Sequence, residues 1–287
     1  MKRWMALGFG LAGLAATPAR AEDDVFGYTY AAETLPKGET EMALWATDRR
    51  GKDDGRYDAQ DYRLELEHGF ADRFTVSGYL NFAGHHIRGL EPQFGRTDRG
   101  FAFQGVSAEF KYNVLRLDKD PVAFTLYAEP GWSRIRKVEG DRVTEYELEL
   151  KAIVQKDFMH GALIWAANLT FEPEWEHDRE ADETAGERDW EKELKLELTS
   201  GLSYRVAPGW YAGLEGRYAS VYPNWTRGLQ RDSYAMFAGP AIHYGAKKWS
   251  ATLTYLPQLF GSPSPGGSRA PGEYEKRELR LKIGYEF

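Results

Sequence analysis

The last nine residues of the chain, Leu279 to Phe287, read Leu-Arg-Leu-Lys-Ile-Gly-Tyr-Glu-Phe. Every odd-numbered position in this stretch is apolar or aromatic, and every even-numbered position is charged or glycine. Because successive side chains of a β-strand point to opposite faces, this period of two predicts a strand with one apolar face and one polar face.

The same alternation recurs upstream, most clearly in 62–67, 106–112, 146–152 and 193–202. In total the chain contains twelve strand-like stretches, each longer than the ~9–11 residues that a tilted strand needs to cross a bilayer. They are 38–49, 57–69, 73–85, 101–115, 121–135, 142–156, 160–175, 189–206, 209–222, 232–244, 248–259 and 273–287. Trp45 and Phe237 fall on the face that the charged residues occupy, which leaves the register of the first and tenth stretches open.

The connections between these stretches alternate in length. One set is short, and the other set, 50–56, 86–100, 136–141, 176–188, 223–231 and 260–272, is mostly longer and more polar. Short turns on one rim and long loops on the other are typical of outer-membrane barrels. The sequence therefore predicts an all-β fold for 38–287, a transmembrane antiparallel up-and-down β-barrel of about twelve strands.

Alternation alone does not say which face is inside. Twelve strands at ~4.8 Å spacing and ~40° tilt enclose a backbone diameter of roughly 24 Å, which inward-pointing leucines would leave partly empty. We therefore expect the apolar face to point outward at lipid and the charged face inward. A periplasmic β-sandwich with half-buried sheets is the alternative.

The first residues have the features of a secretory signal peptide. Lys2 and Arg3 precede an apolar run from Trp4 to Ala16, and Ala19-Arg20-Ala21 is a small-x-small cleavage site. Cleavage after Ala21 would change the net charge from −7 to −10, and such an acidic chain argues against nucleic acid as a partner. This gives three parts: a signal peptide (1–21), an N-terminal periplasmic segment (22–37) and the barrel (38–287).

Charged residues on the predicted inward face are candidates to line a lumen. Twelve are acidic and seven basic, a net charge of −5. One interpretation is that ion pairs across strands simply satisfy a polar interior. The other is a narrow, weakly cation-favouring pore, because carboxylates lower the energy of cations in transit. The residues are Arg63, Glu65, Glu67, Glu109, Lys111, Glu129, Glu147, Glu149, Lys151, Glu172, Glu193, Lys195, Glu197, Glu215, Arg217, Glu278, Arg280, Lys282 and Glu286.

Metal, cofactor and catalytic signals are weak. His85 and His86 end one strand and His177 precedes an acidic loop, but the chain has no cysteine and no His-x-x-x-His spacing, so we expect no metal site and no cofactor. A solvated loop is the simpler explanation, with divalent cations bridging it to lipopolysaccharide as the alternative. A lipid hydrolase needs a His two residues before a Ser on the lipid face. None of the six histidines has one, so an enzyme is a distant third reading.

Three motifs carry a family resemblance. They are Leu35-Pro36-Lys37-Gly38-Glu39, the Gly69-Phe70-Ala71-Asp72-Arg73-Phe74 turn, and the terminal strand. From Gly38 to Phe287 the chain resembles uncharacterised outer-membrane β-barrel proteins of Gram-negative bacteria, described as porin-like proteins or transporters. In such barrels the assembly machinery recognises a closing strand that ends on an aromatic residue, here Leu279, Leu281, Ile283, Tyr285 and Phe287.

The resemblance implies an outer-membrane location, contact with outer-membrane lipid and lipopolysaccharide, and assembly by the barrel assembly machinery. It also implies a narrow diffusion channel or transporter for small hydrophilic solutes, neutral or cationic. A closed barrel that acts as a surface binding or structural platform through loops 86–100 and 176–188 stays open as the alternative.

Overall fold

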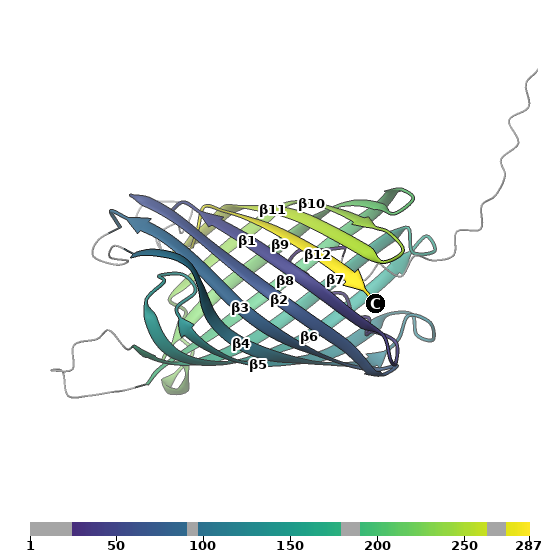
Figure 1. Cartoon of the computed structure of the whole chain (residues 1–287), viewed down its shortest axis with the longest axis horizontal. Helices are drawn as coiled ribbons and strands as arrows, with labels where there is room; N and C mark the ends of the chain where they lie inside the picture. The colour runs from purple at the N-terminus through teal and green to yellow at the C-terminus, as the bar shows by residue number, and fades with distance from the viewer. Residues whose placement is uncertain (1–24, 91–96, 179–189, 263–273) are drawn as a thin grey trace, which may run out of the picture.

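The computed structural model describes residues 25–90, 97–178, 190–262 and 274–287. Twelve strands follow one another along the chain and form one closed antiparallel barrel (Figure 1). None of the described residues forms a helix long and apolar enough to cross a bilayer. The strands are β1 (Thr40–Arg50), β2 (Arg56–Ala71), β3 (Phe74–Arg88), β4 (Thr97–Leu115), β5 (Ala123–Ile135), β6 (Arg142–Phe158), β7 (Leu163–Asp178), β8 (Glu191–Ala207), β9 (Trp210–Pro223), β10 (Ser233–Gly245), β11 (Trp249–Ser262) and β12 (Arg277–Glu286).

The barrel closes where the first strand meets the last. β1 and β12 pair antiparallel over ten residue pairs, from Glu41 opposite Glu286 to Arg50 opposite Arg277. Since β1 also pairs along its whole length with β2, no strand edge is left unpaired. Closure matters because an unpaired backbone N–H or C=O costs several kcal/mol in hydrocarbon. The predicted fold class, with twelve strands, is confirmed.

Predicted and observed strand ends differ most at β4 and β12. β4 begins at Thr97, four residues before the expected start, because its polar first residues continue to pair with β3. There Asp98 accepts a hydrogen bond from Arg88 at 2.8 Å and lies 2.7 Å from a ring nitrogen of His86. Hydrophobic alternation cannot detect a strand end that polar cross-strand contacts extend.

The two faces of the wall differ in the way that a membrane barrel requires. Outward-facing leucines are exposed, with Leu66 at 57% and Leu214 at 66%, whereas Glu109 and Glu215 are 1% and 2% exposed inside the barrel. Aromatic pairs such as Trp249 with Tyr285, whose ring centroids are 4.6 Å apart, lie near the rims. The sandwich alternative is excluded, because the strands form one closed barrel rather than two stacked sheets.

Residues 25–35, which belong to the segment expected over 22–37, lie inside the barrel. Residues 25–32 and Leu35 are buried, and the backbone of this segment bonds to inward-facing side chains of the wall. The sequence shows no alternation here because the segment is not a strand. Residues 1–24, which contain the predicted signal peptide, lie outside the described residues.

An arginine on the outer surface tests the orientation of the wall. Leu198 lies near the middle of β8 and is 51% exposed. If it faces lipid, Leu198→Arg should lower the free energy of unfolding by about 2–4 kcal/mol, measured by urea titration in lipid vesicles. Leu229→Arg is the matched control, because this 69% exposed leucine lies in the loop between β9 and β10. Equal, small effects at both positions would contradict a lipid-facing band.

Candidate functional site

The N-terminal segment, defined here as residues 25–35, follows an arch through the lumen. Its end nearest β1 is fixed at the short-turn rim, where the Leu35 N–H donates to Thr75 Oγ1 at 3.0 Å near the start of β3. Its other end returns to the same rim, since Phe26 packs with Ile164 near the start of β7. The middle of the segment, around Tyr28, extends deeper into the barrel.

One carboxylate binds three consecutive backbone N–H groups of the segment. Glu215 of β9 accepts hydrogen bonds from Gly27 at 2.6 Å, Tyr28 at 2.8 Å and Thr29 at 3.0 Å. The Thr254 hydroxyl of β11 donates a fourth at 2.7 Å. Successive N–H groups that converge on one point form a concave anion-binding nest, so the segment is shaped to receive this carboxylate.

Uncharged side chains hold the rest of the segment. Asn168 accepts from the Tyr30 N–H at 2.6 Å and donates to the Tyr30 carbonyl at 2.9 Å. Gln155 accepts from the Ala32 N–H at 2.8 Å, and Asn113 donates to the Ala32 carbonyl at 2.7 Å. Within the described residues the segment joins no strand ladder, so it is held by side chains alone.

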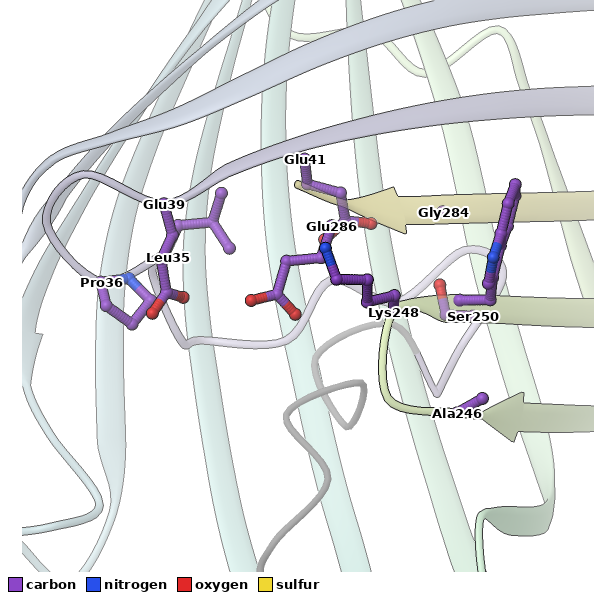
Figure 2. Close-up of a pocket in the computed structure, with 10 residues that line it drawn as sticks. Leu35, Pro36, Glu39, Glu41, Ala246, Lys248, Ser250, Gly284 and Glu286 are labelled. Atoms are coloured by element: carbon purple, nitrogen blue, oxygen red, sulfur yellow. The ribbon is translucent and has the colours of Figure 1, made fainter.

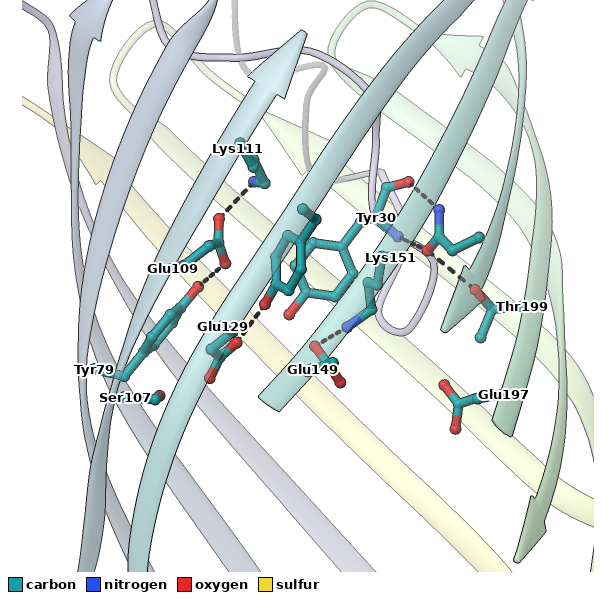
Figure 3. A network of polar contacts seen from close by, with 12 residues as sticks. Tyr30, Tyr79, Ser107, Glu109, Lys111, Glu129, Glu149, Lys151, Glu197 and Thr199 are labelled. Carbon is teal, nitrogen blue, oxygen red and sulfur yellow. Dashed lines mark hydrogen bonds and ion pairs between the residues drawn. The ribbon is translucent and has the colours of Figure 1, made fainter. Parts of the chain in front are cut away.

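The Tyr30 ring lies at the centre of this arrangement (Figure 3). Its centroid is 5.3 Å from that of Tyr127 and 5.9 Å from that of Trp45. Three ammonium groups lie over the same ring, those of Lys151 at 4.5 Å, Lys282 at 5.3 Å and Lys111 at 5.5 Å. Cation–π contacts of this kind strengthen when they are desolvated, as they are here. The Trp45 ring points inward because it packs with Tyr30, and the Lys282 ammonium lies 3.8 Å from its centroid.

The segment also supplies most of the apolar packing inside the barrel. Of the four buried apolar clusters, one contains Tyr30 with Trp45, a second contains Phe26, and a third contains Tyr28 with Phe237. Phe237 therefore faces inward for the same reason as Trp45. Among the described residues, three of the four buried apolar clusters thus include a residue of the segment, and the fourth lies at the long-loop rim.

All of the lumen candidates lie on inward-facing positions, and the structure brings most of them into pairs or networks. Arg63 pairs with Glu129, Lys111 with Glu67 and Glu109, Lys151 with Glu149, Lys195 with Glu193, and Arg217 with Glu197 and Glu278. Glu65 accepts from Trp45 and Tyr79, Glu215 binds the segment, Arg280 donates to the Gly27 carbonyl, and Lys282 lies over Trp45. Whether Glu147, Glu172 and the others line a solute path stays a prediction.

Carboxylates gather on one side of the wall. Glu145, Glu147 and Glu174, from β6 and β7, each bring an oxygen within 4.8 Å of the other two. The nearby ammonium of Lys195 is 2.6 Å from Glu174 and supplies positive charge to the group. On this side of the lumen three carboxyl groups therefore lie close to a single lysine ammonium group.

A loop narrows the barrel at the long-loop rim. In the connection between β5 and β6, the Val138 carbonyl accepts from the Tyr57 hydroxyl at 3.0 Å, and the Lys137 carbonyl lies 3.0 Å from His85 Nε2. Tyr57 and Val138 also belong to a buried apolar cluster of the outer lumen. Burial lowers the pKa of the Lys137 ammonium, because the charged form loses hydration.

Glu275, just before β12, is buried at the same rim. It is 4% exposed and lies 3.5 Å from Arg49 and 3.7 Å from Arg217. Burial, reinforced by the neighbouring Glu278 carboxylate, raises the pKa of Glu275 to about 7. Its charge therefore changes near neutral pH.

Two histidines lie inside the barrel and a third lies at its long-loop end. His85 and His243 are buried inside the barrel, and His243 Nδ1 lies 2.7 Å from Thr252 Oγ1. His86 is paired with Asp98 at the long-loop end. The acidic loop after His177 falls in 179–189, outside the described residues.

A small cavity lies where the segment meets the wall at the short-turn rim (Figure 2). Its volume is about 30 Å³. It is lined by Leu35, Pro36, Glu39, Glu41, Ala246, Lys248, Trp249, Ser250, Gly284 and Glu286.

Sequence reasoning missed the polar side chains that bind the segment. Asn113, Gln155 and Asn168 are uncharged residues at inward positions of strands whose other inward residues include glutamates and lysines. Amide side chains can bind both an N–H and a C=O group, so amides among charged inward-facing residues are the sequence feature that could have indicated a bound backbone segment. It gains meaning only once the segment is known to lie opposite.

A side chain at Gly201 should expel the segment from its contact with the wall. A Cβ there would lie 2.5 Å from the Phe26 ring, so Gly201→Val should expose the segment and make chymotrypsin cleavage after Phe26 or Tyr28 several-fold faster, followed by mass spectrometry. Gly78→Val is the control, because a Cβ at Gly78 meets nothing within 4 Å. Unchanged cleavage in both variants would contradict the observed packing of Phe26.

Comparisons with known proteins agree with the architecture. No curated protein matches the sequence. The structure is similar to that of the COG4313 outer membrane channel from Pseudomonas putida F1, with a TM-score of 0.60 and 15% identity over 89% of this chain and 98% of that chain. It is also similar to the beta domain of the Bordetella autotransporter Brka, with a TM-score of 0.55 and 13% identity over 88% and 100%.

The KdgM porin matches at a TM-score of 0.48 and 12% identity over 86% of this chain and 99% of that chain. The two likenesses with TM-scores of 0.60 and 0.55 show the fold, a β-barrel like those of outer-membrane proteins, and not the solute. A family model matches residues 18–287, which include the whole barrel and the N-terminal segment. The chain therefore belongs to the family described as "Family of unknown function (DUF6662)".

Proposed function

We propose that the protein is a channel in the outer membrane of a Gram-negative bacterium, through which small hydrophilic solutes, neutral or cationic, cross by passive or facilitated diffusion. The observation that carries this proposal is the charged inner wall enclosed by an outer surface of exposed leucines. A signal peptide over 1–21 would export the chain, and the barrel assembly machinery would recognise its terminal strand. Outer-membrane lipid and lipopolysaccharide would surround the barrel.

The dimensions support a lumen that can conduct. A backbone diameter of roughly 24 Å leaves more room than inward side chains fill. In this structure residues 25–35 take up much of that room, and side chains rather than strand pairing hold them. A segment bound in this way can leave without opening the barrel wall, and water can then follow the charged inner face.

The distribution of charge supports a preference for cations. Glu147, which no described lysine or arginine pairs with, lies beside Glu145 and Glu174 on one side of the lumen. Acidic groups in a narrow, water-filled passage raise the local concentration of cations and lower their transit energy. Neutral hydrophilic solutes would cross without this electrostatic contribution.

Removing three lumen charges should move ion selectivity toward anions. In planar bilayers with a salt gradient, the variant carrying Glu147→Gln, Glu149→Gln and Glu197→Gln should show a reversal potential shifted toward the anion value, because three carboxylates no longer favour cations. Glu191→Gln, at the outer end of β8, is the matched control. Absent conductance, or a selectivity that these substitutions leave unchanged, would rule out the proposed pore.

Selectivity should also depend on pH through Glu275. Since its pKa is raised to about 7, Glu275 is mostly protonated at pH 5 and mostly charged at pH 9. Cation selectivity measured by reversal potential should therefore rise between about pH 6 and pH 8. Glu275→Gln should make this rise smaller. A pH profile identical in the two proteins would show that Glu275 does not face the ion path.

A closed barrel used as a binding or structural platform is the second candidate. It is favoured by the filling of both ends, by the N-terminal segment at one rim and by the loop at 136–141 at the other. This alternative predicts no conductance under any condition. It also predicts a cellular phenotype when loops 86–100 or 176–188 are deleted.

A further inference from the structure

Glu215 differs from every other wall residue that touches the segment. It is a carboxylate with four donors, and three of them belong to the segment. Within the described wall, no lysine or arginine nitrogen lies within ion-pair distance of it. Its charge is therefore stabilised by backbone N–H groups of Gly27, Tyr28 and Thr29 rather than by a salt bridge.

Apart from the charge-assisted bond from Arg280 to the Gly27 carbonyl at 3.1 Å, the other hydrogen bonds to the segment are individually weaker. Asn168, Gln155 and Asn113 make neutral hydrogen bonds, which are roughly half as strong as those to an ionised group. Each of these side chains, and Glu215 itself, could bond to water if the segment left the lumen. Water would then replace the N–H and C=O groups of the segment as the hydrogen-bond partner of these side chains.

The shape of the segment suits movement as a unit. Both of its ends lie at the short-turn rim, and only its middle, from Gly27 to Tyr30, reaches the deeper lumen. Withdrawal toward that rim would break no strand pairing. It would free the space beside Lys151, Lys282 and Trp45 that the Tyr30 ring now fills.

We propose that residues 25–35 are the gate of the channel and that Glu215 is the latch that holds the gate closed. The gate is an autoinhibitory contact within the chain, and its role rests on the proposed channel function. The closed state is the one in this structure. The open state has the segment withdrawn toward the short-turn rim and the charged wall hydrated.

A single thiol reports the position of the gate directly. The chain has no cysteine, and Ala32 is 0% exposed, so Ala32→Cys introduces one small, fully buried thiol. In the full chain, reconstituted in vesicles, this thiol should react slowly with a charged methanethiosulfonate reagent. Adding Glu215→Gln should raise the labelling rate at least about tenfold, because the charge-assisted bonds to three N–H groups are lost. The same substitution should raise the open probability in planar bilayers.

Two further variants keep the result interpretable. Glu33→Gln makes the same chemical change on an exposed residue of the segment and should leave labelling unchanged. Thr254→Val removes one donor to Glu215 while preserving side-chain shape, and should accelerate labelling about two- to threefold even if Glu215→Gln fails to fold.

The outcomes separate the two proposals. Equal labelling rates with Glu215 intact and replaced, together with no effect of Thr254→Val, would overturn the latch whatever the conductance. Fast labelling in the Glu215→Gln variant without conductance in any variant would leave a releasable segment but remove the channel. Labelling and open probability that rise together support both.

Discussion

The requirement that every backbone N–H and C=O be paired within hydrocarbon governs the whole molecule. The pairing of β1 with β12 meets it by closing the sheet. Closure of twelve strands then fixes a diameter too large for inward side chains to fill. The contents of the lumen, whether water, charged side chains or a length of chain, follow from that geometry. In this structure charged groups and residues 25–35 share the space.

A polar lumen can hold this partly apolar segment because the polar and apolar groups of the segment contact different side chains of the wall. The segment's backbone polar groups bond to Glu215, Asn168 and Gln155, while its aromatic rings pack with the few inward aromatic residues of the wall. Lysines that neutralise nearby glutamates also lie over those rings. The wall is consequently able to accept either the segment or water, which an apolar interior could not do.

The alternation of apolar and charged residues along the strands predicts the barrel wall, but it does not predict the segment that lies in the lumen. Leu194, Leu196 and Leu198 against Glu193, Lys195 and Glu197 specify a strand, its facing and its length, because lipid and water impose opposite demands on neighbouring residues. No such periodic demand acts on residues 25–35, whose partners are scattered over strands from β1 to β12. Long-range contacts between an irregular segment and single polar side chains leave no pattern in a sequence taken alone.

The route of the segment has a consequence for biogenesis. A lumen exists only after β12 has met β1, yet residues 25–35 precede both strands in the chain. The full set of contacts of the segment requires strands that are made long after it, since Glu215 lies on β9, Thr254 on β11 and Arg280 on β12. Residues that are synthesised before the first strand are therefore among the last to acquire all of their final contacts.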